Sequence, residues 1–172
     1  MKMKQWMAAG AVMSLGMAAT AWAASGIADI KGIAPGSKIE GKAALQDTPS
    51  GLHVTAALSN LPPGVHGFHI HENGNCGDNG KAAGGHYNPF GAPHGLVMKA
   101  GVHHAHAGDL GNITAGPDGK ATVDATIPGI TLSSGPYSVD GRAFIVHEKA
   151  DDFSQPAGNA GGRIACGIIK LQ

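Results

Sequence analysis

The sequence predicts an all-β fold from its breaker content, its residue alternation and its turn signals. The chain of 172 residues contains 28 glycines and 10 prolines, which are too many helix-breaking residues for long helices. Between positions 52 and 59, apolar and polar residues alternate with a period of two, which is typical of a half-buried strand. Turn signals follow at 60–64 (NLPPG) and at 117–119 (PDG).

The expected strands can be placed in order along the chain by the same criteria. They are 27–33, 38–46, 52–59, 65–71, 120–127, 137–147 and 163–171. Two stretches, 72–109 and 148–162, are rich in Gly, Asn, Asp and Pro and fit no strand. A compact domain seldom keeps loops of this length without a function, so both loops become candidate parts of a site.

The first 23 residues are expected to be a cleaved secretion signal. Lys2 and Lys4 give a positive start, an apolar run covers 7–20, and Ala21-Trp22-Ala23 fits the small-x-small cleavage pattern. The apolar run is short for a membrane span, and no second run follows. We therefore expect cleavage after Ala23, export to the periplasm, and a single mature domain at 24–172.

Charge and cysteine content narrow the possible partners and the compartment. Without Lys2 and Lys4, the chain has 10 basic and 12 acidic residues, which gives no support for nucleic-acid or anionic-membrane binding. Only Cys76 and Cys166 are present, and both lie in glycine-rich surroundings. Export makes a disulfide between them the expected state, with two buried thiols as the alternative.

Six histidines and one aspartate follow an order that metal binding explains well. His69 and His71 are two residues apart in an expected strand and so share a face, and His147 ends another apolar strand. Together with His86 they form an all-nitrogen set that suits copper. The second set, which suits tetrahedral zinc, consists of His94, His106, Asp109 and, through its other ring nitrogen, His86. Seven ligands therefore predict two metal ions that share one imidazole.

The remaining histidines have simpler interpretations. His53 lies on the polar face of a strand and is expected to be solvated. His66 is expected to be structural, with ligation as the less favoured alternative. His103 and His104 crowd His106, and either could replace it as a zinc ligand, although exposed loop positions are preferred.

Five motifs in this order resemble copper/zinc superoxide dismutase over nearly the whole mature chain. They are GFHIHE at 67–72, GHYNP at 85–89, GDLGN at 108–112, VHEKADD at 146–152 and GNAGGRIACG at 158–167. The resemblance implies an eight-stranded Greek-key barrel or sandwich of immunoglobulin-like architecture with two long functional loops. It also implies dismutation of superoxide anion to oxygen and hydrogen peroxide by copper beside a structural zinc, protecting against extracytoplasmic superoxide. A homodimer is left open.

The resemblance also assigns roles other than metal binding. Arg163 matches an arginine that attracts and orients the anion, and His86 matches the bridging imidazole that carries a proton. Asp151 matches a carboxylate that joins His69 to His94. Cys76 and Cys166 match a disulfide within the subunit.

Three departures separate this chain from the animal enzymes of that family. Ala157 stands where a threonine lines their channel, and the second loop is short and lacks their steering charges. The segment between Cys76 and His86 is longer than in those enzymes and contains Lys81. This segment looks like that of the bacterial exported form, and we expect Lys81 to share in steering the anion. The competing function is a non-enzymatic copper or zinc buffer, which needs the ligands but has no use for Arg163.

Overall fold

The computed structural model describes residues 23–133 and 135–172, and the regular secondary structure of this part of the chain is almost entirely β-strand. Its strands are β1 Ser25–Gly32, β2 Glu40–Thr48, β3 Gly51–Ser59, β4 Gly64–His71, β5 Asp109–Ala115, β6 Ala121–Ile127, β7 Ala143–His147, β8 Arg163–Ile168 and β9 Lys170–Leu171. Two short helical turns, η1 Lys81–Ala83 and α1 Val97–Ala100, lie between β4 and β5. Residues 1–22 of the expected secretion signal lie outside the described residues. Among the described residues, no helix is long and apolar enough to cross a membrane.

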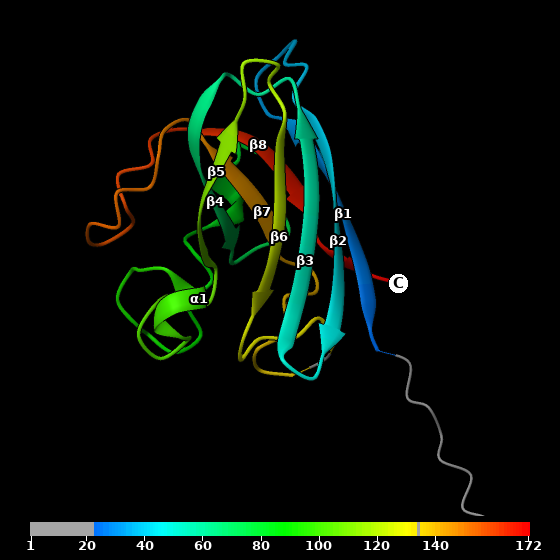
Figure 1. Cartoon of the computed structure of the whole chain (residues 1–172), viewed down its shortest axis with the longest axis vertical. Coiled ribbons are helices and arrows are strands. Elements are labelled where there is room, and N and C mark those ends of the chain that lie inside the picture. The colour runs from blue at the N-terminus through cyan, green and yellow to red at the C-terminus, as the bar shows by residue number, and fades with distance from the viewer. Residues whose placement is uncertain (1–22, 134) are drawn as a thin grey trace, which may run out of the picture.

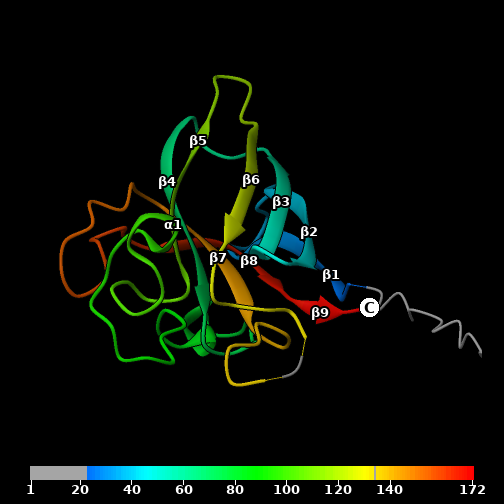
Figure 2. The same cartoon turned by 60° about the horizontal axis from the view of Figure 1, so that its bottom comes forward.

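The strands form one antiparallel sheet that curls into a nearly closed barrel (Figures 1 and 2). Their order is β5-β4-β7-β8-β1-β2-β3-β6, and β9 pairs with β1. The turn between β5 and β6 is closed by Gly116, whose N–H donates to the Lys120 carbonyl at 3.0 Å. The expected all-β barrel is therefore confirmed.

Burial differs between the two halves of the barrel. In β3 the apolar residues point inward in strict alternation, so one face packs in the core and the other faces solvent. In β4 the last six residues are all buried, and β7 is buried throughout. Because loops cover their outer face, β4 and β7 can hold polar side chains away from water on that side.

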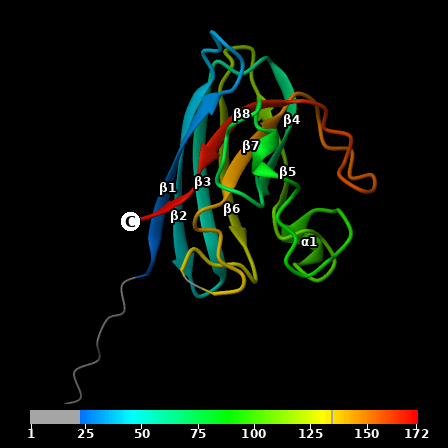
Figure 3. The same cartoon turned by 180° about the vertical axis from the view of Figure 1, so that it is seen from behind.

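Both irregular segments expected from the sequence lie on the same side of the barrel (Figures 1 and 3). The first contains α1 and η1, and the second joins β7 to β8. Cys76 in the first loop forms a disulfide with Cys166 in β8, with a Cα–Cα distance of 5.8 Å. The predicted disulfide is thus present, and it fastens the first loop to the barrel.

Three details of the strand prediction were wrong. The strand β5 was not expected, because Gly111 adopts a φ of +81° and a bulge shifts the β4–β5 register between Gly67 and His69, which breaks the alternation. The expected strand at 137–147 is a strand only from Ala143 onward, since the segment before it turns on itself: the Arg142 N–H donates to the Val139 carbonyl. The last expected strand is interrupted between β8 and β9.

Candidate metal centre

The four residues expected to bind copper converge at one point. His69 and His71 come from β4, His147 ends β7, and His86 comes from the loop after η1. Each offers one nitrogen, and these four atoms all lie within 4.8 Å of one another. Between the two strand histidines, Ile70 packs in the core and is fully buried, as the alternation of a strand requires.

Backbone carbonyls orient two of these rings. His71 Nδ1 donates to the Gly84 carbonyl at 3.0 Å, and His147 Nδ1 donates to the Gly161 carbonyl at 3.4 Å. Their Nε2 atoms are left facing each other at 3.4 Å. Because Nδ1 is the donor in each ring, the two Nε2 atoms direct their lone pairs to a common point. This arrangement suits a bound cation and is unfavourable in a core held together by hydrogen bonds alone.

The residues expected to bind zinc gather around the Asp109 carboxylate. His86 Nδ1 lies 2.7 Å from Oδ1, His94 Nδ1 lies 2.8 Å from Oδ2, and His106 Nδ1 lies 3.1 Å from Oδ1. One ligand atom from each of the four residues lies within 4.8 Å of the others. Three imidazoles and one carboxylate at this spacing match a tetrahedral zinc donor set.

Two ring nitrogens show that these clusters fit metal ions. Among the described residues, His69 Nδ1 and His94 Nδ1 are the buried side-chain polar atoms without a hydrogen-bond partner. His94 Nδ1 is close to Asp109, but without hydrogen-bond geometry. Buried polar atoms are normally satisfied, so an orphan in each cluster is best explained by a cation bound there.

One imidazole belongs to both clusters. The Nδ1 atom of His86 faces Asp109 on the zinc side, which leaves Nε2 for the copper side. The ring stands 4.2 Å from the His69 ring and 5.6 Å from the His106 ring, measured between centroids. The sequence prediction of a shared ligand therefore has the required geometry.

The Asp151 carboxylate connects a histidine of one cluster to a histidine of the other. Its carboxylate accepts a hydrogen bond from His69 Nε2 at 2.9 Å and another from His94 Nε2 at 2.9 Å. The backbone of Asp151 is itself held by Asn112, whose amide accepts from its N–H at 2.7 Å and donates to its carbonyl at 2.8 Å. This arrangement fixes the tautomer of both rings and leaves each Nδ1 free for a metal.

Arg163 begins β8 and lies beside the copper cluster. Its guanidinium donates to the carbonyls of Gly80 and Gly84, both in the loop between Cys76 and His86. Together with His71, His86 and His147 it lines a cavity of about 320 Å³. A guanidinium held at the wall of an open cavity has the charge and the donor geometry that a small anion requires.

Burial keeps the strand histidines neutral. It lowers the pKa of His71 to about 2 and that of His147 to about 3. Burial alone would raise the pKa of Asp109, but hydrogen bonds from His106 and His86 outweigh it and hold that pKa well below its usual value. Neutral imidazoles and an ionised carboxylate are the forms that bind metals.

The other histidines lie apart from both clusters. His53 pairs with Asp124 at 2.9 Å on the surface, and His103 and His104 are exposed loop residues. His66 is buried, and its two ring nitrogens lie 2.9 and 2.8 Å from the carbonyls of His147 and Pro62. These positions agree with the simpler interpretations preferred from the sequence.

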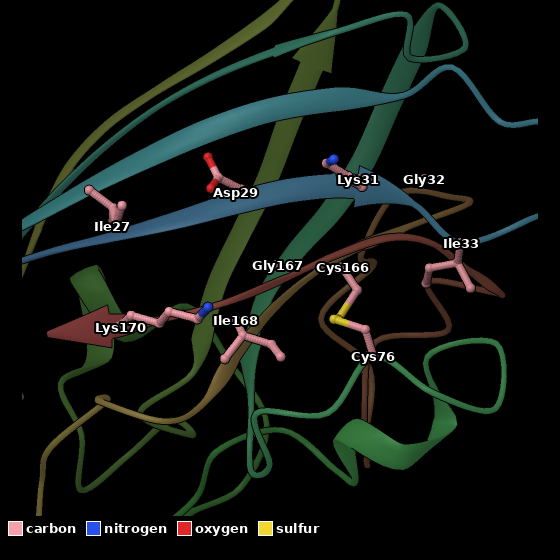
Figure 4. Close-up of a pocket in the computed structure, with 10 residues that line it drawn as sticks. All are labelled: Ile27, Asp29, Lys31, Gly32, Ile33, Cys76, Cys166, Gly167, Ile168 and Lys170. Atoms are coloured by element: carbon pink, nitrogen blue, oxygen red, sulfur yellow. A yellow bond between two sulfur atoms is a disulfide. The ribbon is translucent and has the colours of Figure 1, made fainter.

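A second cavity of about 470 Å³ lies away from the histidines, where β1 meets β8 (Figure 4). The disulfide sulfurs of Cys76 and Cys166 face it, together with Lys31 and Lys170. None of its lining residues belongs to the two clusters.

Sequence reasoning missed two amide side chains that hold this centre. Asn112 holds Asp151, and Gln155 makes two hydrogen bonds to the backbone of His94. Nothing in the sequence pattern pointed to Gln155, because it lies in an irregular loop. Asn112 stands within one of the quoted motifs, but its role depends on a contact 39 residues away.

Comparison with known proteins agrees with this geometry. Residues 39–169 match the family model described as copper/zinc superoxide dismutase. Among solved structures, the crystal structure of the clock protein EA4 is similar, with a TM-score of 0.76 and 34% sequence identity. The similarity covers 93% of this chain and 100% of that one.

Proposed function

The chain belongs to the copper/zinc superoxide dismutase family, and we propose that it is an exported dismutase protecting the periplasm from superoxide. Members of this family are oxidoreductases that use copper and zinc and take superoxide as substrate. Copper, when bound, supplies the one-electron chemistry, and zinc is redox-silent. For this chain we assign copper to His69, His71, His86 and His147, and zinc to His86, His94, His106 and Asp109.

The shared ring of His86 is the observation that carries this proposal. A protein that only stores metal ions has no need to hold one imidazole between two clusters. Here Nδ1 is fixed on the zinc side, so Nε2 remains as the atom that can hold a proton and pass it to reduced substrate. Forming hydrogen peroxide from two superoxide anions consumes two protons, and His86 stands at the cavity where they are needed.

Arg163 provides the second argument for an enzyme over a metal buffer. Its guanidinium is fixed by two carbonyls and lines the same cavity as His86. A pinned cation beside the copper cluster attracts and orients a small anion but contributes nothing to metal storage.

Export is supported by the signal-like sequence of residues 1–23 and by the disulfide between Cys76 and Cys166. Cell fractionation combined with the mass of the mature protein tests this part. A protein that starts at Ala24 and fractionates with the periplasm is expected. Full-length protein in the cytoplasm would contradict it.

Metal analysis and superoxide turnover on the purified protein test the activity. We expect one copper and one zinc per chain and rapid turnover. Arg163→Ala should keep both metals and lower kcat/KM by about tenfold or more, because the anion loses its orienting fork. Arg163→Lys should fall in between, since it keeps the charge without the fork. Full metal content without turnover would favour the metal buffer.

A further inference from the structure

The zinc-side residue His94 is held at both its side chain and its backbone. Its Nε2 donates to the Asp151 carboxylate at 2.9 Å. Its N–H donates to Gln155 Oε1 at 2.9 Å, and its carbonyl accepts from Gln155 Nε2 at 2.9 Å. The Gln155 amide therefore faces the backbone of His94 as a neighbouring strand would, and both of its polar atoms are used.

Gln155 belongs to a turn that packs directly over the link between Asp151 and His94. The Gly158 N–H donates to the Ser154 carbonyl at 2.8 Å and closes this turn. A Cβ at Gly158 would lie 2.6 Å from His94 Nε2 and still closer to the Asp151 carboxylate. The turn therefore fits closely against the zinc side and leaves no room for a side chain at position 158.

The same turn continues into the cavity wall. Pro156 and Ala157 follow Gln155 and line the cavity that contains His86 and Arg163. A movement of Gln155 relative to His94 would thus disturb the zinc ligand and the cavity wall together. No other side chain among the described residues joins the backbone of His94 to this loop by hydrogen bonds.

We propose that Gln155 is a positioning residue that sets the orientation of His94 for zinc. The inference rests on the proposed ligation of zinc by His94. Asp151 fixes one side of the ring, and the amide of Gln155 fixes the backbone from which the ring extends. Together they aim Nδ1, which has no hydrogen-bond partner, at the zinc cluster. Without the amide, the backbone is free to move and the ring turns on its remaining bond to Asp151.

The zinc affinity of the mature protein, residues 24–172, tests this inference when it is measured by chelator competition. Gln155→Met is similar in size but lacks both hydrogen bonds, and should weaken zinc binding about 10- to 100-fold with little change in copper affinity. Cobalt(II) placed at the zinc site should show altered visible absorption bands, because the ligand geometry changes. The matched control is Gln46→Met, at an exposed position in β2, which should leave both readouts unchanged.

Gln155→Asn provides the second variant in case the methionine variant does not fold. It keeps the amide but is one methylene shorter, so it cannot make both hydrogen bonds, and it should also weaken zinc binding and alter the cobalt spectrum. A lower melting temperature with unchanged zinc affinity and spectrum would overturn the proposal. A wild-type protein that binds no zinc would instead contradict the proposed function, so the two failures are distinguishable.

Discussion

The copper and zinc sides of this centre are built in different ways. On the copper side, His69, His71 and His147 come from paired strands, β4 and β7, and two of the rings are oriented by backbone carbonyls. On the zinc side, His94 and His106 come from a loop that the Asp109 carboxylate and neighbouring amides hold together. Three of the four copper-side residues therefore stand on the barrel, whereas His94 and His106 stand on a loop, and we expect the zinc side to depend more on its ion for order.

Removal of a strand ligand should produce the largest effect. His147→Ala is expected to abolish copper binding and superoxide turnover while zinc binding remains, because the zinc cluster does not include this residue. Metal analysis and turnover measure both outcomes. His106→Ala is the matched variant on the zinc side, and it should lose zinc before copper. Equal loss of both metals in both variants would mean that the two sides are not independent.

Removal of the metals should loosen the zinc side much more than the copper side. The N–H groups of Gly95 and His106 donate to the buried Asp109 carboxylate, which no metal cation balances in the metal-free protein. We expect their hydrogen exchange to accelerate at least about tenfold in the metal-free protein. The Ile145 N–H in β7, which is paired with strands on both sides, should change little. Uniform acceleration over strands and loop would contradict the proposed difference.

Acid should destabilise the metal-free protein through the copper side first. The pKa of His71 is about 2 and that of His147 about 3, against an ordinary value of 6.5. Below pH 6.5 the unfolded chain therefore binds protons that the folded chain excludes, and stability falls as the pH falls. Each ring contributes at most about 1.4 kcal/mol per pH unit.

Denaturant unfolding of the metal-free protein between pH 8 and pH 4 measures this loss. The Asp151 carboxylate, whose pKa is lowered to about 2, adds to this loss of stability only below its ordinary pKa of 3.8. The His147→Ala variant should show a shallower pH dependence, since one of the two rings is gone. A flat profile between pH 6.5 and 4 would contradict the prediction.

The smallest expected effect concerns steering by Lys81. This exposed residue begins η1, between the two glycines that hold Arg163. Lys81→Ala should lower the rate by less than about threefold at low salt and leave it unchanged at high salt, because screening removes the contribution of an exposed charge. Lys170→Ala, in the separate cavity between β1 and β8, is the control. An identical rate and salt dependence in Lys81→Ala would end the steering hypothesis.

The copper side was also easier to predict from the sequence than the zinc side. The i, i+2 spacing of His69 and His71 in an alternating strand was sufficient to bring them together, since a strand fixes which face a side chain takes. The strand β5, which begins at Asp109, was missed because a bulge and a left-handed glycine interrupt its pattern. The supports of the zinc side are Gln155, in a loop, and Asn112, in β5. Both act through contacts with loop residues far away in the sequence, which no sequence period reveals.

A single peptide oxygen, that of Gly84, is the common reference point for His71 and Arg163. Residue 84 has φ +76° and ψ −153°, a combination open in practice only to glycine, and a Cβ there would meet the Glu72 carboxylate at 2.6 Å. Substitution at position 84 is therefore strongly constrained. A side chain at position 84 would displace this carbonyl and so misalign the copper-side ligand His71 and the anion-binding Arg163 together.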